Sequence, residues 1–291
     1  SQYNAKAYST IDSLLKHDID IVSVCTPNGF HAEHVIKSLQ AGKHVLCEEP
    51  LCITGAAAWQ IIETEKFSGK KLFVVNSFRY NPVLQDLKRL IDERLLGDVY
   101  SFQLNCFWNC PASYYSEWRG KKFPGGGALY IEASYCINVL LWLLGDVIEV
   151  KGYISNTARK KMIEYEDTGT AALKMKNNIL GTINWSANAF EKNENFELTI
   201  LAEKGTVCLG GKYLNELKYQ YGEKFLSLPI VDTENNSGLY QNSINNYKEV
   251  YTNLIKALQN EDHSSSSSFN GLKTVETIEC IYKAVNQSLP A

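Results

Sequence analysis

The sequence predicts an α/β plus α+β fold, in which a partial Rossmann-type parallel sheet is followed by a domain with a large, mainly antiparallel sheet. In the first part of the chain, apolar strand segments alternate with helices of roughly 10–15 residues, which is typical of a doubly wound parallel sheet. Beyond residue 97, most strand segments follow one another through short turns, which favours antiparallel pairing. We therefore expect a truncated Rossmann-type domain in residues 1–80 and a second domain in residues 81–291.

The first domain is expected to contain three strands with helices between them. In the helix that begins at His31, Val35 and Leu39 recur on one stripe, and Gly42 is positioned to end it. The expected elements, in order, are helix 11–16, strand 19–25, helix 31–40, strand 44–47, helix 56–67 and strand 71–75.

The second domain is predicted to begin with a helix after Pro82 that ends near Leu96, because Leu84, Leu87 and Leu90 recur at helical spacing. Strands are expected at 99–108, 147–154, 168–175, 179–186, 197–202, 206–209 and 216–219, interrupted by one helix at 128–144. Two helices, 244–258 and 272–285, close the chain. The five consecutive serines of segment 263–268 predict a flexible connector between these helices.

Composition excludes several classes of protein. The 291 residues are 45% hydrophobic and 21% charged with a net charge of −3, which argues against nucleic acid or an anionic membrane as the main partner. The strongest apolar run, 136–144, is too short to span a bilayer, and the start does not resemble a signal sequence. The eight cysteines are scattered without a CxxC pair, which predicts free buried thiols in a reducing cytoplasm and no metal site.

The parallel half lacks the usual phosphate-binding turn. A dinucleotide-binding half normally opens with a strand, a glycine-rich turn and a helix whose N-terminus holds the pyrophosphate. No such turn precedes Ile19, and Gly125-Gly126-Gly127 lies in the second domain, where it predicts a tight turn ahead of a helix. By itself, this sheet is expected to bind a dinucleotide poorly.

An ordered series of motifs covers nearly the whole chain. It comprises Cys25-Thr26-Pro27-Asn28 with His31, the run Gly42-Lys43-His44-Val45-Leu46-Cys47-Glu48-Glu49-Pro50, Arg79-Tyr80-Asn81-Pro82, Tyr114-Tyr115, Trp118-Arg119-Gly120 and Gly125-Gly126-Gly127-Ala128-Leu129. This series strongly resembles the glucose–fructose oxidoreductase/inositol dehydrogenase (Gfo/Idh/MocA) family. It is most similar to the branch that acts on nucleotide sugars in bacterial surface-polysaccharide synthesis.

The resemblance implies a Rossmann dinucleotide-binding domain followed by a substrate and oligomerisation domain built on an open sheet. Similar proteins oxidise a hydroxyl of a sugar or nucleotide sugar with NAD or NADP, and assemble through the open sheet face as homo-dimers or homo-tetramers. By the same alignment, this chain begins after the first strand, the glycine-rich turn, the first helix and the second strand.

The resemblance implies that three catalytic positions of the family are substituted here. The lysine of the family's Glu-Lys-Pro motif corresponds to Glu49, and a carboxylate would repel the developing alkoxide that an ammonium stabilises. The family's Asp and His, four residues apart on one helix face, correspond to Ile131 and Tyr135. Two roles stay open for Tyr135: a hydrogen-bond donor or base with a lowered pKa, or an aromatic residue packing at the domain interface.

The remaining family positions are intact and imply a cofactor-binding set. Thr26, Pro27 and Asn28 would line the nicotinamide ribose with His31 near them, and Glu48 would approach the ribose and nicotinamide. Arg79 and Asn81 would border the cleft, while Trp118 and Arg119 would close over the cofactor.

The resemblance therefore implies an NAD(P)-dependent oxidoreductase of a sugar or nucleotide sugar whose activity is impaired or absent in this chain. The alternative is a non-catalytic relative, a possible pseudoenzyme that acts as an oligomeric partner, regulatory subunit or ligand-binding subunit. A third hypothesis is a truncated, decayed copy without activity.

Overall fold

The computed structural model describes residues 5–192, 195–226, 246–259 and 267–286. A small sheet contains three parallel strands in the order β1 (Ile21–Val24), β2 (His44–Cys47) and β3 (Leu72–Val74). The accompanying helices are α1 (Ile11–Leu14), the 3₁₀ turn η1 (Asn28–Phe30), α2 (His31–Gln40) and α3 (Gly55–Ser68). The predicted alternation of strands and helices is confirmed.

Local signals explain where the helices of this half begin and end. The hydroxyl of Thr54 accepts a hydrogen bond from the backbone N–H of Ala57 at 3.2 Å and so caps the start of α3. Gly69 follows the helix in the left-handed region that ends many helices. In α2, Val35 and Leu39 are fully buried on one stripe, as their spacing predicts.

The second half opens with η2 (Ser77–Tyr80) and α4 (Pro82–Asp92). The side chain of Asn81 caps α4 by accepting a hydrogen bond from the N–H of Val83 at 3.0 Å. The prediction that this helix runs to Leu96 is wrong. Arg94 has a φ of 55°, which is incompatible with a continued right-handed helix.

A seven-stranded sheet dominates the second half, with the order β10-β9-β8-β4-β7-β6-β5. Its strands are β4 (Val99–Phe107), β5 (Val147–Ser155), β6 (Thr168–Met175), β7 (Leu180–Ser186), β8 (Asn195–Ala202), β9 (Gly205–Gly210) and β10 (Glu216–Gly222). All neighbouring pairs are antiparallel except β4 with β7, which run parallel. The prediction of a mainly antiparallel sheet, made from the short turns, is therefore confirmed, and one pair of strands is parallel.

The segment between β4 and β5 contains the turn η3 (Ala112–Tyr115), the short helix α5 (Lys122–Gly125), a π-helical turn η4 (Leu129–Ala133) and α6 (Ser134–Leu144). The helical stretch Lys122–Leu144 is long and apolar enough to span a membrane by length and composition, although 78% of its apolar window is buried inside the protein. This helical stretch is longer than the apolar run 136–144 noted in the sequence, because it begins at Lys122. Its burial is that of a core helix.

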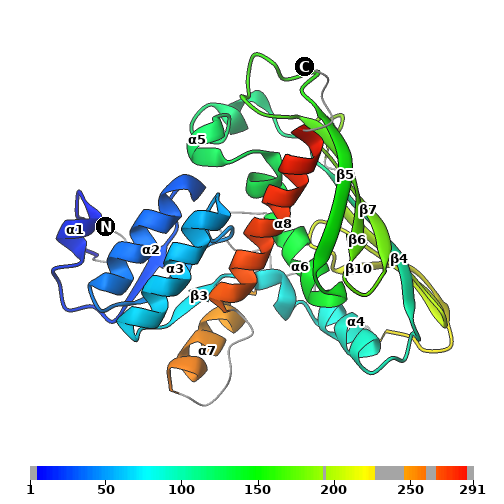
Figure 1. Ribbon diagram of the computed structural model, residues 1–291, viewed down its shortest axis with the longest axis horizontal. Coiled ribbons are helices and arrows are strands. Elements are labelled where there is room, and N and C mark those ends of the chain that lie inside the picture. Colours follow the sequence, from blue (N-terminus) through cyan, green and yellow to red (C-terminus); the bar gives the residue numbers. More distant parts are fainter. Residues whose placement is uncertain (1–4, 193–194, 227–245, 260–266, 287–291) are drawn as a thin grey trace.

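The last two helices connect the two halves. α7 (Tyr247–Leu258) places Val250 and Leu254 against Leu46 and Phe73 of the small sheet. Figure 1 shows α8 (Ser268–Asn286) beside α6, between the first helices and the large sheet, and α8 contacts α3, α6, β3 and β5. The predicted division at residue 80 stays a prediction.

The predicted serine connector falls largely outside the described residues, which omit 260–266. Its last residue, Ser268, belongs to α8 rather than to a connector, so the prediction is wrong at that position. The hydroxyl of Ser268 donates a hydrogen bond to Glu65 of α3, which holds the start of α8 against the first half.

Candidate functional site: the carboxyl edge of the parallel sheet

The candidate site lies where β1 and β2 end, because ligands of open parallel sheets bind beyond the carboxyl ends of the strands. Thr26, Pro27 and Asn28 follow β1, and Glu48 and Glu49 follow β2. The structure therefore brings both sequence motifs to one edge of the sheet.

The loop after β1 is held by two buried polar side chains. The amide of Asn28 donates a hydrogen bond to the carbonyl of Gly125 at 3.0 Å, which ties this loop to the triple-glycine turn of the second half. The ring nitrogens of His31 lie 2.7 Å from the carbonyl oxygen of Pro50 and 2.6 Å from that of Thr26. Asn28 and His31 thus organise the edge, and a direct contact with cofactor stays a prediction for both.

Glu49 lies inside a polar network rather than at the surface, with 6% of its area exposed. Its Oε1 accepts a hydrogen bond from Nδ2 of Asn138 at 3.1 Å, and that amide also donates to the hydroxyl of Thr274 at 3.0 Å. Nε of Arg79 donates to Oδ1 of Asn138 at 2.8 Å. α6 and α8 therefore hold the carboxyl that replaces the family's lysine.

Burial raises the pKa of Glu49 to about 8, more than the nearby positive charge of Arg79 lowers it. The carboxyl is therefore mainly neutral at pH 7. The repulsion that we expected between a Glu49 carboxylate and an alkoxide applies only when the group ionises. The protonated carboxyl does not accept a proton from a hydroxyl, whereas its ionised fraction can.

The ring of Tyr135 stacks on that of Phe78, with 5.4 Å between the ring centroids. Burial, and then the charges of Glu48, Tyr247 and Glu49 among others, raise its pKa well above the usual value. The hypothesis of a base with a lowered pKa is therefore wrong, because a phenol in acidic, buried surroundings keeps its proton. The hydroxyl can still donate a hydrogen bond.

Ile131, at the third substituted position, lies against the triple-glycine turn. Its Cδ1 would stand 2.9 Å from a β-carbon added at Gly125, so it fills the space that this glycine leaves. An aliphatic side chain has no proton to transfer, and Ile131 acts here by packing.

Three further residues of the predicted set, Glu48, Asn81 and Arg79, contact residues of the second half of the chain. The carboxyl of Glu48 accepts a hydrogen bond from the hydroxyl of Tyr247 at 2.9 Å, and burial raises its pKa. Asn81 donates to the carbonyl of Tyr213 at 3.3 Å in addition to capping α4. The guanidinium of Arg79 lies 5.6 Å from the ring centre of Trp142.

Trp118 and Arg119 form an aromatic and cationic cluster with Tyr114. The guanidinium carbon of Arg119 lies 4.7 Å from the Trp118 ring centre and 4.9 Å from that of Tyr114. The carbonyl of Arg119 accepts a hydrogen bond from the hydroxyl of Tyr165, which anchors the cluster to the loop before β6. Closure over a cofactor stays a prediction for these two residues.

Unsatisfied polar atoms at the sheet edge fit a polar ligand. Among the described residues, Oε2 of Glu49, Oδ1 of Asn76 and the hydroxyl of Tyr80 are buried without a hydrogen-bond partner. Buried polar groups usually have partners, so such atoms point to a group that the chain itself does not supply. Thr26, Pro27 and Glu48 would hold the nicotinamide ribose of NAD(P), which supplies the hydride acceptor when bound. The described residues contain no cluster of metal ligands.

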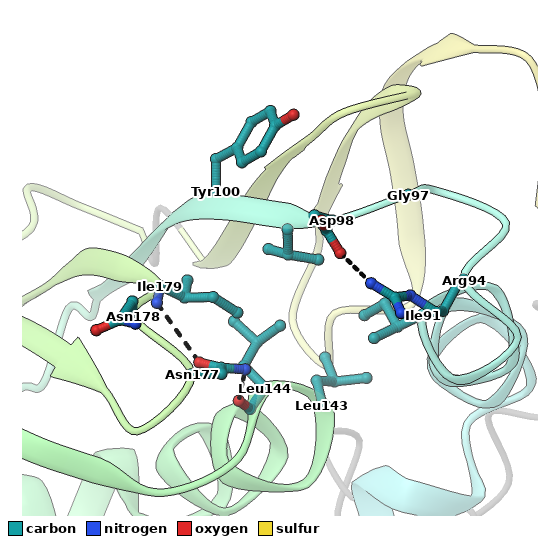
Figure 2. Close-up of a pocket in the computed structure, with 11 residues that line it drawn as sticks. Ile91, Arg94, Gly97, Asp98, Tyr100, Leu143, Leu144, Asn177, Asn178 and Ile179 are labelled. Atoms are coloured by element: carbon teal, nitrogen blue, oxygen red, sulfur yellow. Dashed lines mark hydrogen bonds and ion pairs between the residues drawn. The ribbon is translucent and has the colours of Figure 1, made fainter.

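A separate cavity of about 530 Å³ lies between the end of α4 and the start of β4 (Figure 2). Arg94 pairs there with Asp98, and Asn177 bonds the carbonyl of Leu144 and the N–H of Ile179. These polar side chains of the cavity are thus already bonded within the chain, and the cavity contains none of the residues predicted for the site.

Sequence reasoning missed three residues of the site: Asn138, Tyr247 and Glu132. Asn138 and Tyr247 are unremarkable in sequence, because only the packing of distant helices brings them to Glu49 and Glu48. Glu132 carried a detectable signal, since it is the single acidic residue in the apolar stretch 128–144.

Comparisons with known proteins agree with this architecture. The family described as "Oxidoreductase family, NAD-binding Rossmann fold" matches residues 1–76, and the "GFO/IDH/MocA C-terminal domain" matches residues 84–208. Levoglucosan dehydrogenase of Pseudarthrobacter phenanthrenivorans is 25% identical over 228 residues, 70% of this chain and 58% of the relative. D-glucoside 3-dehydrogenase of Escherichia coli is 26% identical over 56% of this chain and 48% of the relative. The chain thus spans less than two thirds of the length of these curated relatives.

Two solved structures resemble nearly the whole chain. The WlbA dehydrogenase of Bordetella pertussis, in complex with NADH and UDP-GlcNAcA, is 30% identical with a TM-score of 0.85, and the match covers 97% of this chain and 83% of that one. The WlbA dehydrogenase of Chromobacterium violaceum, with the same ligands, is 31% identical with a TM-score of 0.88 over 99% and 83%. The chain belongs to the Gfo/Idh/MocA family of NAD-binding oxidoreductases.

Proposed function

We propose that this chain binds a sugar or nucleotide sugar beside NAD(P) at the carboxyl edge of its parallel sheet, and that its oxidoreductase chemistry is impaired. The ligand class is supported by the WlbA structures, whose complexes contain NADH and UDP-GlcNAcA. Curated relatives named as sugar dehydrogenases support the same class.

The observation that carries this proposal is that a buried carboxyl, Glu49, and a phenol stacked on Phe78, Tyr135, stand where the resemblance implies a lysine and a histidine. Oxidation of an alcohol needs a group that accepts the hydroxyl proton, and loss of one such group lowers the rate by roughly 10²–10⁴. Burial raises the pKa of Glu49 to about 8, so only a minor fraction of this carboxyl is ionised at pH 7, and it raises the pKa of Tyr135 well above the usual value. We infer that these two positions supply little base at pH 7.

A second candidate function is that of a non-catalytic partner, and the open face of the large sheet favours it. Tyr153, Leu180 and Tyr221 are 71%, 56% and 69% exposed, and the strand register places them on one face. Along the same face, Asn184 bonds both Thr170 and Asn105 in a row of polar side chains. We infer that this face joins copies of the chain as a homo-dimer or homo-tetramer.

We also propose a cytoplasmic location. All eight cysteines are free, which fits a reducing compartment. Cys25 and Cys280 are exposed, so the expectation of buried thiols is wrong for these two, although the thiols of the other six are buried.

The proposed function is tested by binding and turnover measured on the same preparation. We expect the wild type to bind UDP-GlcNAcA or UDP-GlcNAc in calorimetry, and to produce no NADH from either above background. Glu49→Lys alone should stay at background because Tyr135 still holds its proton. The combination Glu49→Lys, Asn138→Asp and Tyr135→His should raise NADH formation at least tenfold, since it supplies an ion pair and a base near neutral pH.

Glu164→Lys is the control for adding a lysine, because Glu164 is exposed. Absence of binding of both nucleotide sugars would refute the ligand class. Turnover by the wild type, or by Glu49→Lys at the rate of the triple variant, would refute the impairment.

A further inference from the structure

Glu132 is a partly buried residue with a buried carboxyl oxygen, and it has no role in the chemistry described above. It lies within η4, the π-helical turn between the triple glycine and α6. Such turns are rare and occur frequently at functional sites, because the wide turn changes which side chains share a face of the helix. Glu132 is therefore a candidate for ligand contact on structural grounds alone.

The surroundings of Glu132 satisfy only part of its carboxyl. Tyr114 shares a side-chain hydrogen bond with it, and the positive charge of Arg119 lies within electrostatic reach. Among the described residues, however, Oε1 of Glu132 is buried and has no hydrogen-bond partner. A buried acceptor without a partner is unfavourable, and a ligand hydroxyl would satisfy it.

Glu132 lies within electrostatic reach of the residues at the sheet edge. Its charge acts on Tyr135, whose pKa is also raised by Glu48, Glu49 and Tyr247. The titratable or charged groups around Glu132 are Cys110, Tyr114, Tyr115, Arg119, Tyr135 and Tyr165.

Burial raises the pKa of Glu132 to about 7, against the lowering effects of the Tyr114 hydrogen bond and the Arg119 charge. The pKa values of Cys110 and of the tyrosines around it are raised away from neutrality. Within this cluster, Glu132 is thus the group whose charge changes near neutral pH.

The cluster has the chemistry that a pyranose ring requires. Trp118 and Tyr114 are partly exposed aromatic rings, a kind of side chain that packs against the apolar C–H face of a sugar, and Arg119 lies over both rings. The free carboxyl oxygen supplies the acceptor for a ring hydroxyl. An ionised acceptor makes a hydrogen bond about twice as strong as a neutral one.

We propose that Glu132, positioned by Tyr114 and Arg119, forms a subsite that accepts a hydrogen bond from a ring hydroxyl of the bound sugar. This inference rests on the proposed ligand class and adds a specificity-determining residue that the family motifs do not include. It requires no covalent step.

Calorimetric binding of UDP-GlcNAc, with UDP as the reference ligand, tests the subsite. UDP-GlcNAc is chosen because its sugar carries no charge. At a pH of about 8, we expect Glu132→Gln to weaken UDP-GlcNAc binding about tenfold while UDP binding stays unchanged. Between about pH 5.5 and 8, the wild type should bind UDP-GlcNAc more tightly relative to UDP as Glu132 ionises, and Glu132→Gln should lose this dependence.

Tyr114→Phe separates a ligand role from a purely structural one. Removing the hydroxyl that bonds Glu132 should shift the pH midpoint of UDP-GlcNAc affinity upward, an effect that altered folding would not produce. Glu164→Gln, at an exposed neighbouring position, should leave binding unchanged. If the wild type binds UDP-GlcNAc and Glu132→Gln binds it equally well, the subsite is refuted and the proposed function stands. If the wild type binds no nucleotide sugar, both are refuted.

Discussion

At the scale of single residues, three carboxyls with raised pKa values make the stability of this protein depend on pH. Burial is the main cause that raises the pKa of Glu49 to about 8 and the pKa values of Glu132 and Glu166 to about 7. The Glu166 carboxyl accepts hydrogen bonds from the hydroxyl of Tyr282 at 2.7 Å and from Nε1 of Trp185 at 3.3 Å. All three acids hold protons in the folded chain at pH values where they would be ionised in the unfolded chain.

This difference predicts that the free energy of unfolding falls as the pH rises. The folded state binds more protons between pH 4.5 and about 8, so each fully linked group contributes on the order of 1.4 kcal/mol per pH unit. Of these three groups, Glu49 has the window that extends furthest above pH 7. Glu49→Gln should therefore flatten the decrease between about pH 7 and 8, as measured by urea unfolding.

Glu164→Gln is the control for that measurement, because this exposed glutamate has a pKa lowered by hydrogen bonds from Lys122 and Lys121 and is ionised throughout the window. An equal decrease in stability between about pH 7 and 8 for the wild type and Glu49→Gln would contradict the assignment.

Of the three carboxyls, only Glu49 was singled out from the sequence, and its partners could not be predicted. The motif around Glu49 indicated a substituted site, whereas its contact with Asn138 depends on how α6 packs against the end of β2. Periodicity reports which residues share a face of one element, and not which faces of distant elements meet. The two roles left open for Tyr135 could not be separated for the same reason, because its pKa depends on burial and on distant acidic residues.

At the scale of elements, one aspartate organises the turn between β5 and β6. Oδ2 of Asp167 accepts hydrogen bonds from the backbone N–H groups of Thr157, Ala158 and Arg159 at 3.1, 2.7 and 3.0 Å. Burial raises the pKa of this carboxyl, but backbone and side-chain hydrogen bonds outweigh burial and lower the pKa overall.

Asp167→Ala is expected to destabilise the protein by about 1–3 kcal/mol, because it leaves the backbone N–H groups of Thr157 and Ala158 without their acceptor and leaves that of Arg159 with Asn156 alone. Asp167→Asn, which keeps one acceptor oxygen, should have a smaller effect. Since the folded pKa is lowered, the wild-type advantage over Asp167→Asn should disappear as the pH falls below the ordinary range of an aspartate. Urea midpoints measure each variant, with Asp18→Asn on the exposed surface as the control. Equal midpoints for Asp167→Ala and the wild type would disprove this role.

Elements with strong local signals were predicted closely, and those defined by tertiary contacts were not. The bounds of α2, β2 and β6 agree with the periodicity of the sequence. The left-handed Arg94, the π-turn η4 and the parallel pairing of β4 with β7 have no comparable local signal. Strand direction in particular depends on which distant strand becomes the neighbour.

At the scale of the whole molecule, the large sheet leaves one face open. Tyr153 and Leu180 on this face are exposed, as is Phe67 on α3, far from it in the fold. Clusters of exposed apolar side chains mark interaction surfaces, whereas an isolated exposed residue needs no such explanation. The open sheet face is thus the surface on which self-association can be tested.

Sedimentation velocity should show the wild type as a species larger than the 32.8 kDa monomer. Tyr153→Glu combined with Leu180→Glu should shift it to the monomer, because two charges would be buried at the interface without partners. Phe67→Glu, with the same chemical change outside the sheet face, should sediment like the wild type. A monomeric wild type, or dissociation by Phe67→Glu alone, would count against the interface.

The place of α8 has a consequence for how the protein is made. This helix fills the space between the small sheet and the large one, and it lies almost at the end of the described chain. Domains generally become compact as they leave the ribosome, starting from the N-terminus. Here neither half can complete its core until α8 has been synthesised, so both halves keep the apolar surface that this helix covers exposed until it has left the ribosome.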